Sequence, residues 1–227
     1  MFEGLIVFMP IFRNESSQTV VRRERLKRAI KEGAVDKRKR VVRGKAEEYP
    51  VMHTMFSAVD KHNLGKISKA IDEFALKFPN RKINVLDWGC GWGNSTRQLA
   101  EENPRTNVYG FSKDSYDSHN EPGKATILST SKNAFYRYLK SKKIKFDVVY
   151  SNLGLVYAKD QTAEIIKLSE FVHQGGKIFP GFGRMSKKLN WVKINTLKET
   201  GLEPDFFTIK DVFGEEHHYF VSLTKVK

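Results

Sequence analysis

Along residues 64–227 the apolar positions switch repeatedly between two spacings, one typical of helices and the other of buried strands. The first helical stripe consists of Ile67, Ala70, Ile71, Phe74 and Ala75. Pro79-Asn80 ends this helix, and the branched, nearly continuous apolar run Ile83–Trp88 then predicts a strand.

The same switch recurs down the chain. Further strands are predicted at residues 107–111, 125–128, 146–150 and 177–179, the last after a turn at Gly175-Gly176. Helices are expected between the strands: one capped by Asn94 or Ser95, one over Ala134–Leu139, one from its cap Asp160 to Phe171, and one from Ser186 to Gly201.

The last two predicted strands, 206–212 and 219–225, are separated by too few residues for a crossover helix, so they must pair antiparallel. Strands that alternate with helices imply a parallel sheet with helices on both faces. The pattern therefore predicts an α/β fold of three layers, with a mostly parallel seven-stranded sheet that ends in an antiparallel hairpin.

Charge is concentrated in one stretch. The 227 residues carry 40 Lys and Arg against 26 Asp and Glu, a net charge of +14. Residues 22–45 hold twelve basic and three acidic residues, or +9. We therefore divide the chain at Tyr49-Pro50 into an apolar and basic extension, 1–49, and a compact domain, 50–227. Three interpretations of the basic stretch stay open: a solvated charged face, contact with RNA or DNA, or contact with an anionic membrane surface.

The remaining composition sets limits on the class of protein. Met1–Phe12 is apolar, but it is too short to span a membrane and has no basic residue before the apolar run, so neither stable membrane insertion nor a signal peptide is expected. The single cysteine, Cys90, cannot form an internal disulfide or a zinc site that needs two thiolates. We expect a cytoplasmic protein without a metal site, and its oligomeric state stays open.

A glycine-rich turn follows the first predicted strand of the sheet. Gly89, Gly91 and Gly93 alternate with larger residues, directly after an acid, Asp87, near the strand's end. Glycines let a ligand approach the backbone, and the N–H groups at the start of the next helix favour an anionic group. Such a turn between a strand and a helix is typical of nucleotide-like cofactor sites.

The segment Val85–Gly93 (V-L-D-W-G-C-G-W-G) resembles motif I of the class I S-adenosylmethionine-dependent methyltransferases. Phe146–Leu153 is similar to the family's fourth strand and substrate-side loop, Phe171–Lys177 to its turn into the fifth strand, and the final hairpin to its reversed seventh strand. The resemblance implies a Rossmann-like methyltransferase fold, S-adenosylmethionine as cofactor, and methyl transfer as the reaction.

The resemblance also implies roles for individual residues, which it gathers into a cofactor-binding set of Asp87, Gly89, Gly91, Gly93, Ser112, Asp114, Thr130 and Asn152. The three glycines would surround the methionine part and Asp87 would bind its amino group. The family usually ends its second strand with an acid that holds the ribose. Here Ser112 stands at that position, with Asp114 two residues on, and Thr130 lies where the family contacts adenine.

Several specialised methyl-transfer mechanisms do not fit. Covalent catalysis on pyrimidine carbon needs a cysteine nucleophile, and Cys90 belongs to the glycine loop. The loop after residue 150 lacks the Pro-Pro-aromatic sequence of enzymes that methylate base amines, and Asn152 stands where ribose 2′-O enzymes have an aspartate. Near the expected acceptor pocket remain Asn152, the catalytic candidate Tyr157, and His217-His218, expected on the turn of the hairpin. Tyr157 would stack on or hydrogen-bond the acceptor, or pack on the edge of the sheet.

Three functional hypotheses follow. The leading one is a methyltransferase that acts on RNA, because the basic stretch 22–45 would attract phosphates. The second is a small-molecule methyltransferase whose N-terminal segment covers the acceptor pocket. The third is a binding module that holds S-adenosylmethionine without catalysis, which Ser112 keeps open because it replaces the usual ribose-binding acid.

Overall fold

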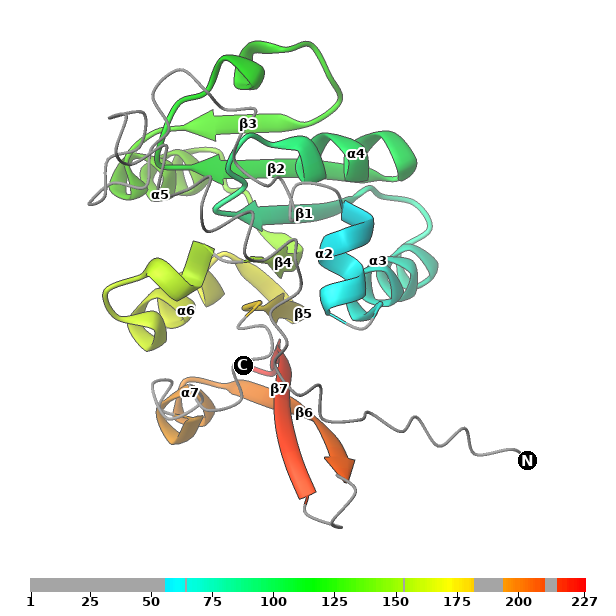
Figure 1. Cartoon of the computed structure of the whole chain (residues 1–227), viewed down its shortest axis with the longest axis vertical. Helices are drawn as coiled ribbons and strands as arrows, with labels where there is room; N and C mark the ends of the chain where they lie inside the picture. Colours follow the sequence, from blue (N-terminus) through cyan, green and yellow to red (C-terminus); the bar gives the residue numbers. More distant parts are fainter. Residues whose placement is uncertain (1–55, 64, 153, 182–193, 211–215) are drawn as a thin grey trace, which may run out of the picture. The chain divides into compact units, whose positions relative to one another are not determined.

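The computed structural model describes residues 56–63, 65–152, 154–181, 194–210 and 216–227 (Figure 1). The apolar segment 1–12, the basic stretch 22–45 and the helix predicted to start at Ser186 lie wholly or partly outside these residues. Within them, a seven-stranded sheet runs through the middle of the structure, with helices on both sides.

The strands are β1 (Ile83–Trp88), β2 (Thr106–Ser112), β3 (Thr126–Ser129), β4 (Phe146–Tyr150), β5 (Val172–Phe179), β6 (Leu202–Lys210) and β7 (Glu216–Lys225). Their order in the sheet is β3-β2-β1-β4-β5-β7-β6. The first five strands are parallel, and β7 lies antiparallel between β5 and β6. This confirms the predicted fold class, including the reversed last strand.

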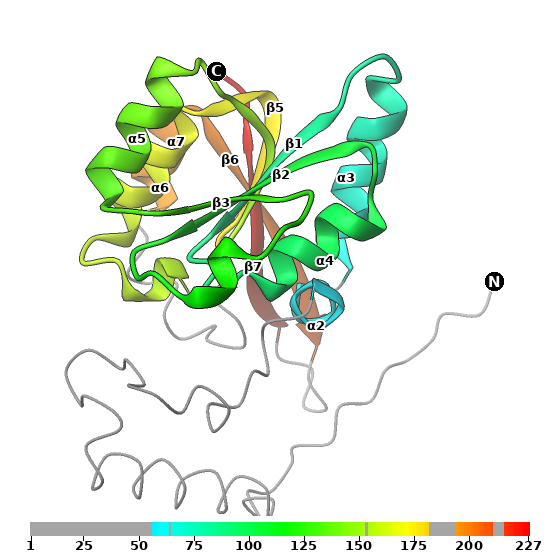
Figure 2. The same cartoon turned by 90° about the horizontal axis from the view of Figure 1, so that it is seen from above.

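In the described part of the chain, six α-helices form the outer layers: α2 (Phe56–His62), α3 (Lys66–Lys77), α4 (Asn94–Glu102), α5 (Lys132–Ser141), α6 (Gln161–Ser169) and α7 (Ile194–Glu199). Seen from above, α2, α3 and α4 cover one face of the sheet and α5, α6 and α7 cover the other (Figure 2). The short 3₁₀ helices η2 (Asp117–Asn120) and η3 (Gly154–Tyr157) lie in connections between these elements. No helix among these described residues is long and apolar enough to cross a membrane.

The sheet separates two hydrophobic clusters. On the first face, the predicted stripe of α3 is buried at Ile67, Ala70, Ile71 and Phe74. On the second, Phe135 and Leu139 of α5 pack with Ile165 and Leu168 of α6. Every residue of β4 is buried, because helices cover both faces of this central strand. Each such large apolar side chain stabilises the fold by about 1.5–3 kcal/mol.

Two predictions about the approach to β5 are wrong. Gly175 and Gly176 do not form a turn before the strand but lie inside it, where the pairing with β4 shifts from Phe146↔Val172 to Val148↔Lys177. Gly175 has φ 79°, so the glycine pair accommodates a bulge in the strand. Phe171 lies beyond α6, which ends at Ser169, and its carbonyl already accepts a hydrogen bond from the Phe146 amide at 2.8 Å.

The end of α5 is unusual in its backbone. The amide of Ile144 donates to the Leu139 carbonyl at 3.0 Å, and the amide of Lys143 donates to the Lys140 carbonyl at 3.2 Å. These two hydrogen bonds together form the Schellman motif, whose left-handed residue is usually glycine. Here that residue is Lys143, with φ 53°, the one non-glycine residue with positive φ in the described part of the chain.

We predict that Lys143→Gly raises the free energy of unfolding by about 1 kcal/mol, because glycine adopts the left-handed conformation without the penalty of a Cβ atom. Urea denaturation of the variant and the wild type measures the difference. Lys142→Gly is the matched control. Lys142 is right-handed, so glycine there should lower the free energy of unfolding. Equal effects of the two substitutions would contradict the explanation.

Candidate active site

The glycine loop lies at the carboxyl end of β1, as predicted. Gly89, Gly91 and Gly93 have φ values of 80°, 55° and 79°, which favour glycine at all three positions. The amides of Gly89 and Cys90 both donate to the Phe111 carbonyl of β2, each at 2.9 Å. A Cβ added at Gly91 would meet no atom within 4 Å. The loop is therefore fastened to the neighbouring strand on one side and open at Gly91.

Helix α4 begins without a side-chain cap, which corrects the prediction that Asn94 or Ser95 caps it. The N-cap residue is Gly93 in a left-handed conformation, and no side chain accepts from the first amides. The hydroxyl of Ser95 instead donates to Asp87 at 2.8 Å. The first N–H groups of α4 carry partial positive charge, so this helix start favours an anionic ligand group.

Asp87 is the centre of a buried polar cluster. It is 2% exposed, and its Oδ2 accepts hydrogen bonds from the hydroxyls of Ser95 and Thr96, both at 2.8 Å. Burial raises the pKa of Asp87, while the hydroxyls of Thr96, Ser95 and the neighbouring Tyr150 act in the opposite direction. Thr96 and Tyr150 were not predicted as site residues from the sequence, and Ser95 was predicted only as a helix cap. The adjacent hydroxyls in the first helical turn after an acid are the signal that was available.

Cys90 is unsuited to act as a nucleophile. Its side chain is buried, and burial, reinforced by the charge of Asp87, raises the pKa of the thiol well above its ordinary value. The thiolate form that covalent catalysis needs is thus disfavoured. Among the described residues, no three His, Cys, Asp or Glu side chains gather into a group that could hold a metal ion.

The loop after β4 meets the glycine loop directly. A Cβ added at Gly89 would lie 2.7 Å from the Gly154 Cα, so the two backbones are in contact. Asn152, in the same loop, is 9% exposed, and neither atom of its amide finds a hydrogen-bond partner among the described residues. Tyr157 ends η3, but its side chain lies outside the described part, so its catalytic role stays a prediction.

At the carboxyl end of β2, the structure brings three further predicted residues together. Ser112 is buried, and its hydroxyl donates to the Asp114 carbonyl at 2.7 Å. The Thr130 amide donates to the Ser112 carbonyl at 3.1 Å. Asp114 itself is exposed. The Ser112 proton is therefore used by the turn, and only the oxygen's acceptor capacity remains for a ligand. The cofactor roles of these residues stay predictions.

His119, which the sequence analysis did not single out, connects two strand ends. Its Nε2 lies 2.6 Å from the Gly91 carbonyl oxygen, and its Nδ1 contacts the Ser129 hydroxyl. Gly91 follows β1 and Ser129 ends β3, so this bridge crosses the carboxyl end of β2, which lies between them. The imidazole thus lies at the carboxyl end of β2, which ends at Ser112.

The segment around His119 is fastened to the glycine loop at a second point. Arg97 of α4 donates to the Ser118 carbonyl at 2.8 Å and to the Trp92 carbonyl at 3.0 Å. The Ser118 hydroxyl also donates to the Trp92 carbonyl at 2.9 Å. Together these bonds hold the connection between β2 and β3 against the glycine loop.

The expectation for His217 and His218 is corrected. Both residues lie within β7, where they pair with Ile209 and Thr208 of β6, rather than on the turn of the hairpin. The strand begins earlier than predicted, at Glu216, because the hairpin pairs along the whole of β6. Their side chains lie outside the described part of the structure.

The fold is similar to that of solved methyltransferase structures. No protein-family model matches the sequence, and a search of curated proteins finds no match. The CurJ carbon methyltransferase matches with a TM-score of 0.57 and 13% identity, over 92% of this chain and 67% of that chain. The plantazolicin methyltransferase BpumL, in complex with a pentazolic desmethylPZN analog and SAH, matches with a TM-score of 0.50 and 13% identity, over 85% and 83%.

A further BpumL structure, in complex with SAH, matches with a TM-score of 0.47 and 18% identity over 71% of this chain. The chain covers 60% of the length of that structure and 66% of another BpumL complex. The chain has the class I, Rossmann-like methyltransferase fold, as its strand order and reversed last strand require.

We predict that Asp87→Asn changes the pH dependence of stability. The pKa of Asp87 is higher in the folded state than its ordinary value of 3.8, so its contribution to stability is largest below that value and is lost as the pH rises through the folded-state pKa. The variant should therefore gain stability relative to the wild type as the pH rises above about 4. Urea denaturation across this range measures the difference.

Ser95→Ala serves as the companion variant. It removes a hydrogen bond that lowers the pKa of Asp87, so the loss of stability with rising pH should become steeper than in the wild type. Parallel pH profiles for wild type and both variants would overturn the assignment of a raised pKa to Asp87.

Proposed function

We propose that the chain is an S-adenosylmethionine-dependent methyltransferase. The observation that carries the proposal is the carboxyl end of β1, where a buried acid precedes a loop of three glycines with positive φ and an uncapped helix start, within a class I methyltransferase fold. The similarity to CurJ, a carbon methyltransferase, and to BpumL, a methyltransferase in complex with SAH, supports the same activity.

The residues of the site fit such a cofactor. The open side of Gly91 leaves space for a ligand against the backbone, and the buried Asn152 amide has donor and acceptor atoms without partners among the described residues. The hydroxyls of Ser95 and Thr96 both donate to the same oxygen of Asp87, Oδ2. Asp87 would therefore hold the cofactor's amino group through its other oxygen, Oδ1. The start of α4 would attract the carboxylate.

The adenosine part would be held at the ends of β2 and β3. Ser112 would accept a hydrogen bond from the ribose, with Asp114 as the nearest carboxylate in sequence and Thr130 beside the adenine. His119 would act as a positioning residue, because both of its ring nitrogens already contact the protein and so keep Gly91 in place.

When bound, S-adenosylmethionine supplies a methyl group on a positively charged sulfur. The chain's own residues then have to align the acceptor with that methyl group and exclude water, since alignment supplies much of the rate of such displacements. Asn152 and Tyr157 would face the acceptor. A general base is required only where the acceptor is a poor nucleophile, and the buried Cys90 thiol does not take part.

Two classes of methyl acceptor, RNA and a small molecule, are considered within this proposal. RNA, the leading hypothesis from the sequence, rests on the basic stretch 22–45, which lies outside the described residues. The small-molecule hypothesis draws support from the similarity to BpumL, a methyltransferase in complex with a desmethylPZN analog. Both hypotheses, and the non-catalytic binding module, enter the tests below.

We predict that Gly91→Ala weakens S-adenosylmethionine binding at least ten-fold, because the added methyl group would enter the open side of the loop. Gly65→Ala is a matched control. Gly65 also has positive φ, 68°, and open space around its Cβ position, but it caps α3 away from the glycine loop. Both substitutions should lower the free energy of unfolding by about 1 kcal/mol.

Isothermal titration calorimetry of the full chain separates the two effects. The proposal fails if the wild type shows no binding of S-adenosylmethionine or SAH at millimolar ligand. An equal loss of affinity in Gly65→Ala and Gly91→Ala would attribute the effect to stability and contradict the placement of the ligand at Gly91.

Catalysis and acceptor class are tested with a labelled methyl group. We predict that the full chain, incubated with methyl-labelled S-adenosylmethionine and total cell lysate, transfers label to one fraction among RNA, protein and small molecules. Asp87→Ala should reduce the transfer at least ten-fold through weaker cofactor binding.

The fractions distinguish the hypotheses. Label in RNA that is lost on deletion of residues 1–45 supports the RNA acceptor, and label in small molecules supports the second hypothesis. Cofactor binding without transfer to any fraction would leave the non-catalytic module as the function.

A further inference from the structure

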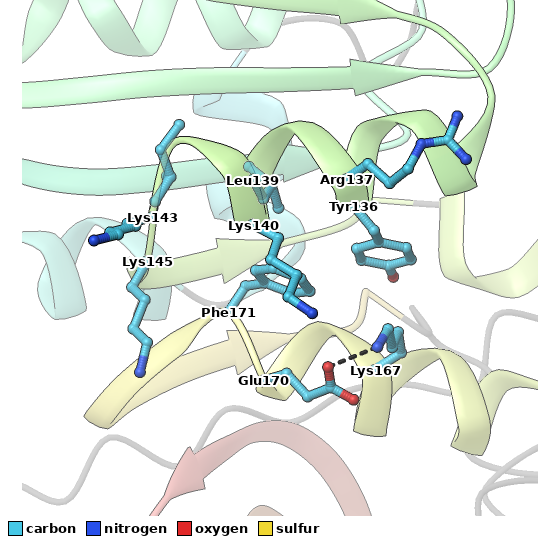
Figure 3. Close-up of a pocket in the computed structure, with 10 residues that line it drawn as sticks. Tyr136, Arg137, Leu139, Lys140, Lys143, Lys145, Lys167, Glu170 and Phe171 are labelled. Atoms are coloured by element: carbon cyan, nitrogen blue, oxygen red, sulfur yellow. Dashed lines mark hydrogen bonds and ion pairs between the residues drawn. The ribbon is translucent and has the colours of Figure 1, made fainter.

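A cavity of about 480 Å³ lies between α5 and α6, away from the glycine loop (Figure 3). Its lining comes from α5 and the residues after it, and from the junction of α6 with β5. Lys145 directly precedes β4, and Phe171 directly precedes β5. The pocket therefore lies at the amino ends of these strands, whereas the glycine loop lies at the carboxyl end of β1.

The pocket has a strong excess of positive charge. Its lining includes one carboxylate, Glu170, and five cations: Arg137, Lys140, Lys143, Lys145 and Lys167. Glu170 pairs with Lys167 at 2.6 Å, as Figure 3 shows. The other four cations have no carboxylate within salt-bridge distance in the described part of the chain. Four positive charges thus remain for a ligand.

Backbone geometry marks one of these cations. Lys143 occupies the left-handed position of the Schellman motif at the end of α5, where glycine is usual. A lysine there costs folding stability and adds an ammonium group to the pocket. Strained positions of this kind cluster at functional sites. In Figure 3, Lys143 and Lys145 stand at one end of the pocket and Lys167 at the other.

The positive field extends beyond the pocket wall. Burial is the main reason that the pKa of Lys225 is lowered, and the charge of Lys145 lowers it further. The pKa of His173 is also lowered, first by burial, and the charges of Arg81, Lys145 and Lys225 act in the same direction against Asp147. An anion near Lys145 would relieve this repulsion.

The bottom of the pocket is apolar. Ile144 lines it beside Phe171, whose ring stacks with Tyr136 at 5.3 Å between centroids, and the fully buried Leu139 lies behind them. A small inorganic ion would leave this surface uncovered. The lining therefore matches a ligand with an anionic group at the rim and an organic body below, in a volume typical of small-molecule sites.

We propose that this pocket binds a nucleotide, with its phosphate held by Lys140, Lys143 and Lys145 and its body against Ile144 and Phe171. A phosphate carries up to two negative charges and accepts from several ammonium groups without a fixed geometry, which suits three flexible lysines. The nucleotide is either free or part of an RNA strand. The proposal does not depend on methyl transfer.

Calorimetric titration of the full chain at low salt tests the proposal with three probes: adenosine monophosphate, inorganic phosphate and a single-stranded ten-nucleotide oligoadenylate. We expect adenosine monophosphate to bind more tightly than phosphate. The combined variant Lys140→Gln, Lys143→Gln, Lys145→Gln should lose at least ten-fold in affinity for the nucleotide while binding S-adenosylmethionine as the wild type does. The matched control, Lys61→Gln, Lys66→Gln, Lys198→Gln, removes the same charge elsewhere and should retain nucleotide binding.

Lys143→Gly provides a second variant that should not unfold, because glycine suits the backbone there. It should weaken nucleotide binding while it raises stability. Tighter binding of oligoadenylate than of the mononucleotide, with loss of the difference in the triple variant, identifies RNA as the source; equal binding identifies free nucleotide. No binding of adenosine monophosphate or oligoadenylate, or equal loss in the triple variant and its charge-matched control, would overturn the proposal.

Discussion

The backbone contact between Gly89 and Gly154 is the constraint on which the site depends. A Cβ on Gly154 would lie 2.9 Å from the Gly89 Cα, and a Cβ on Gly181 would overlap the Ser151 carbonyl. The carboxyl ends of β1, β4 and β5 therefore meet without side chains between them. This close approach fixes the glycine loop against the loop after β4, so the geometry around Asn152 follows from backbone packing rather than from side-chain contacts.

Close to that contact, the fold buries Asp87, whose charged form is disfavoured by burial. The Asp87 carboxylate is desolvated, and the hydroxyls of Ser95, Thr96 and Tyr150 offset only part of the effect, since the pKa of Asp87 stays raised. Ser95 would favour the N-cap by propensity, but it donates to Asp87 instead. The N-cap of α4 is Gly93, which has no side chain, so the start of the helix is uncapped. A ligand with an amino group and a carboxylate would satisfy both, which links the unfavourable features of the free protein to its proposed cofactor.

The sequence predicts what depends on local pattern. The strands Ile83–Trp88 and Phe146–Tyr150 agree with the structure to the residue, because continuous apolar runs in a parallel sheet are buried on both faces. Gly175-Gly176 was misassigned because a glycine pair is equally suited to a turn and to a bulge. His119 could not be found from sequence, since its partners Gly91 and Ser129 lie 28 and 10 residues away and only the order of the strands brings them together.

The distribution of charge, like His119, is understood only when the structure is added to the sequence. The excess seemed confined to residues 22–45, yet residues 132–145 contain six basic and no acidic residues. Part of this second cluster has a local explanation, because cations near the C-terminus of α5 interact favourably with the helix dipole. That explanation covers Lys140 but not Lys143, whose left-handed backbone opposes folding, nor Lys145, whose charge disfavours the protonated forms of Lys225 and His173. Helix stability alone therefore does not account for the positive charge around the pocket, and a bound anion would.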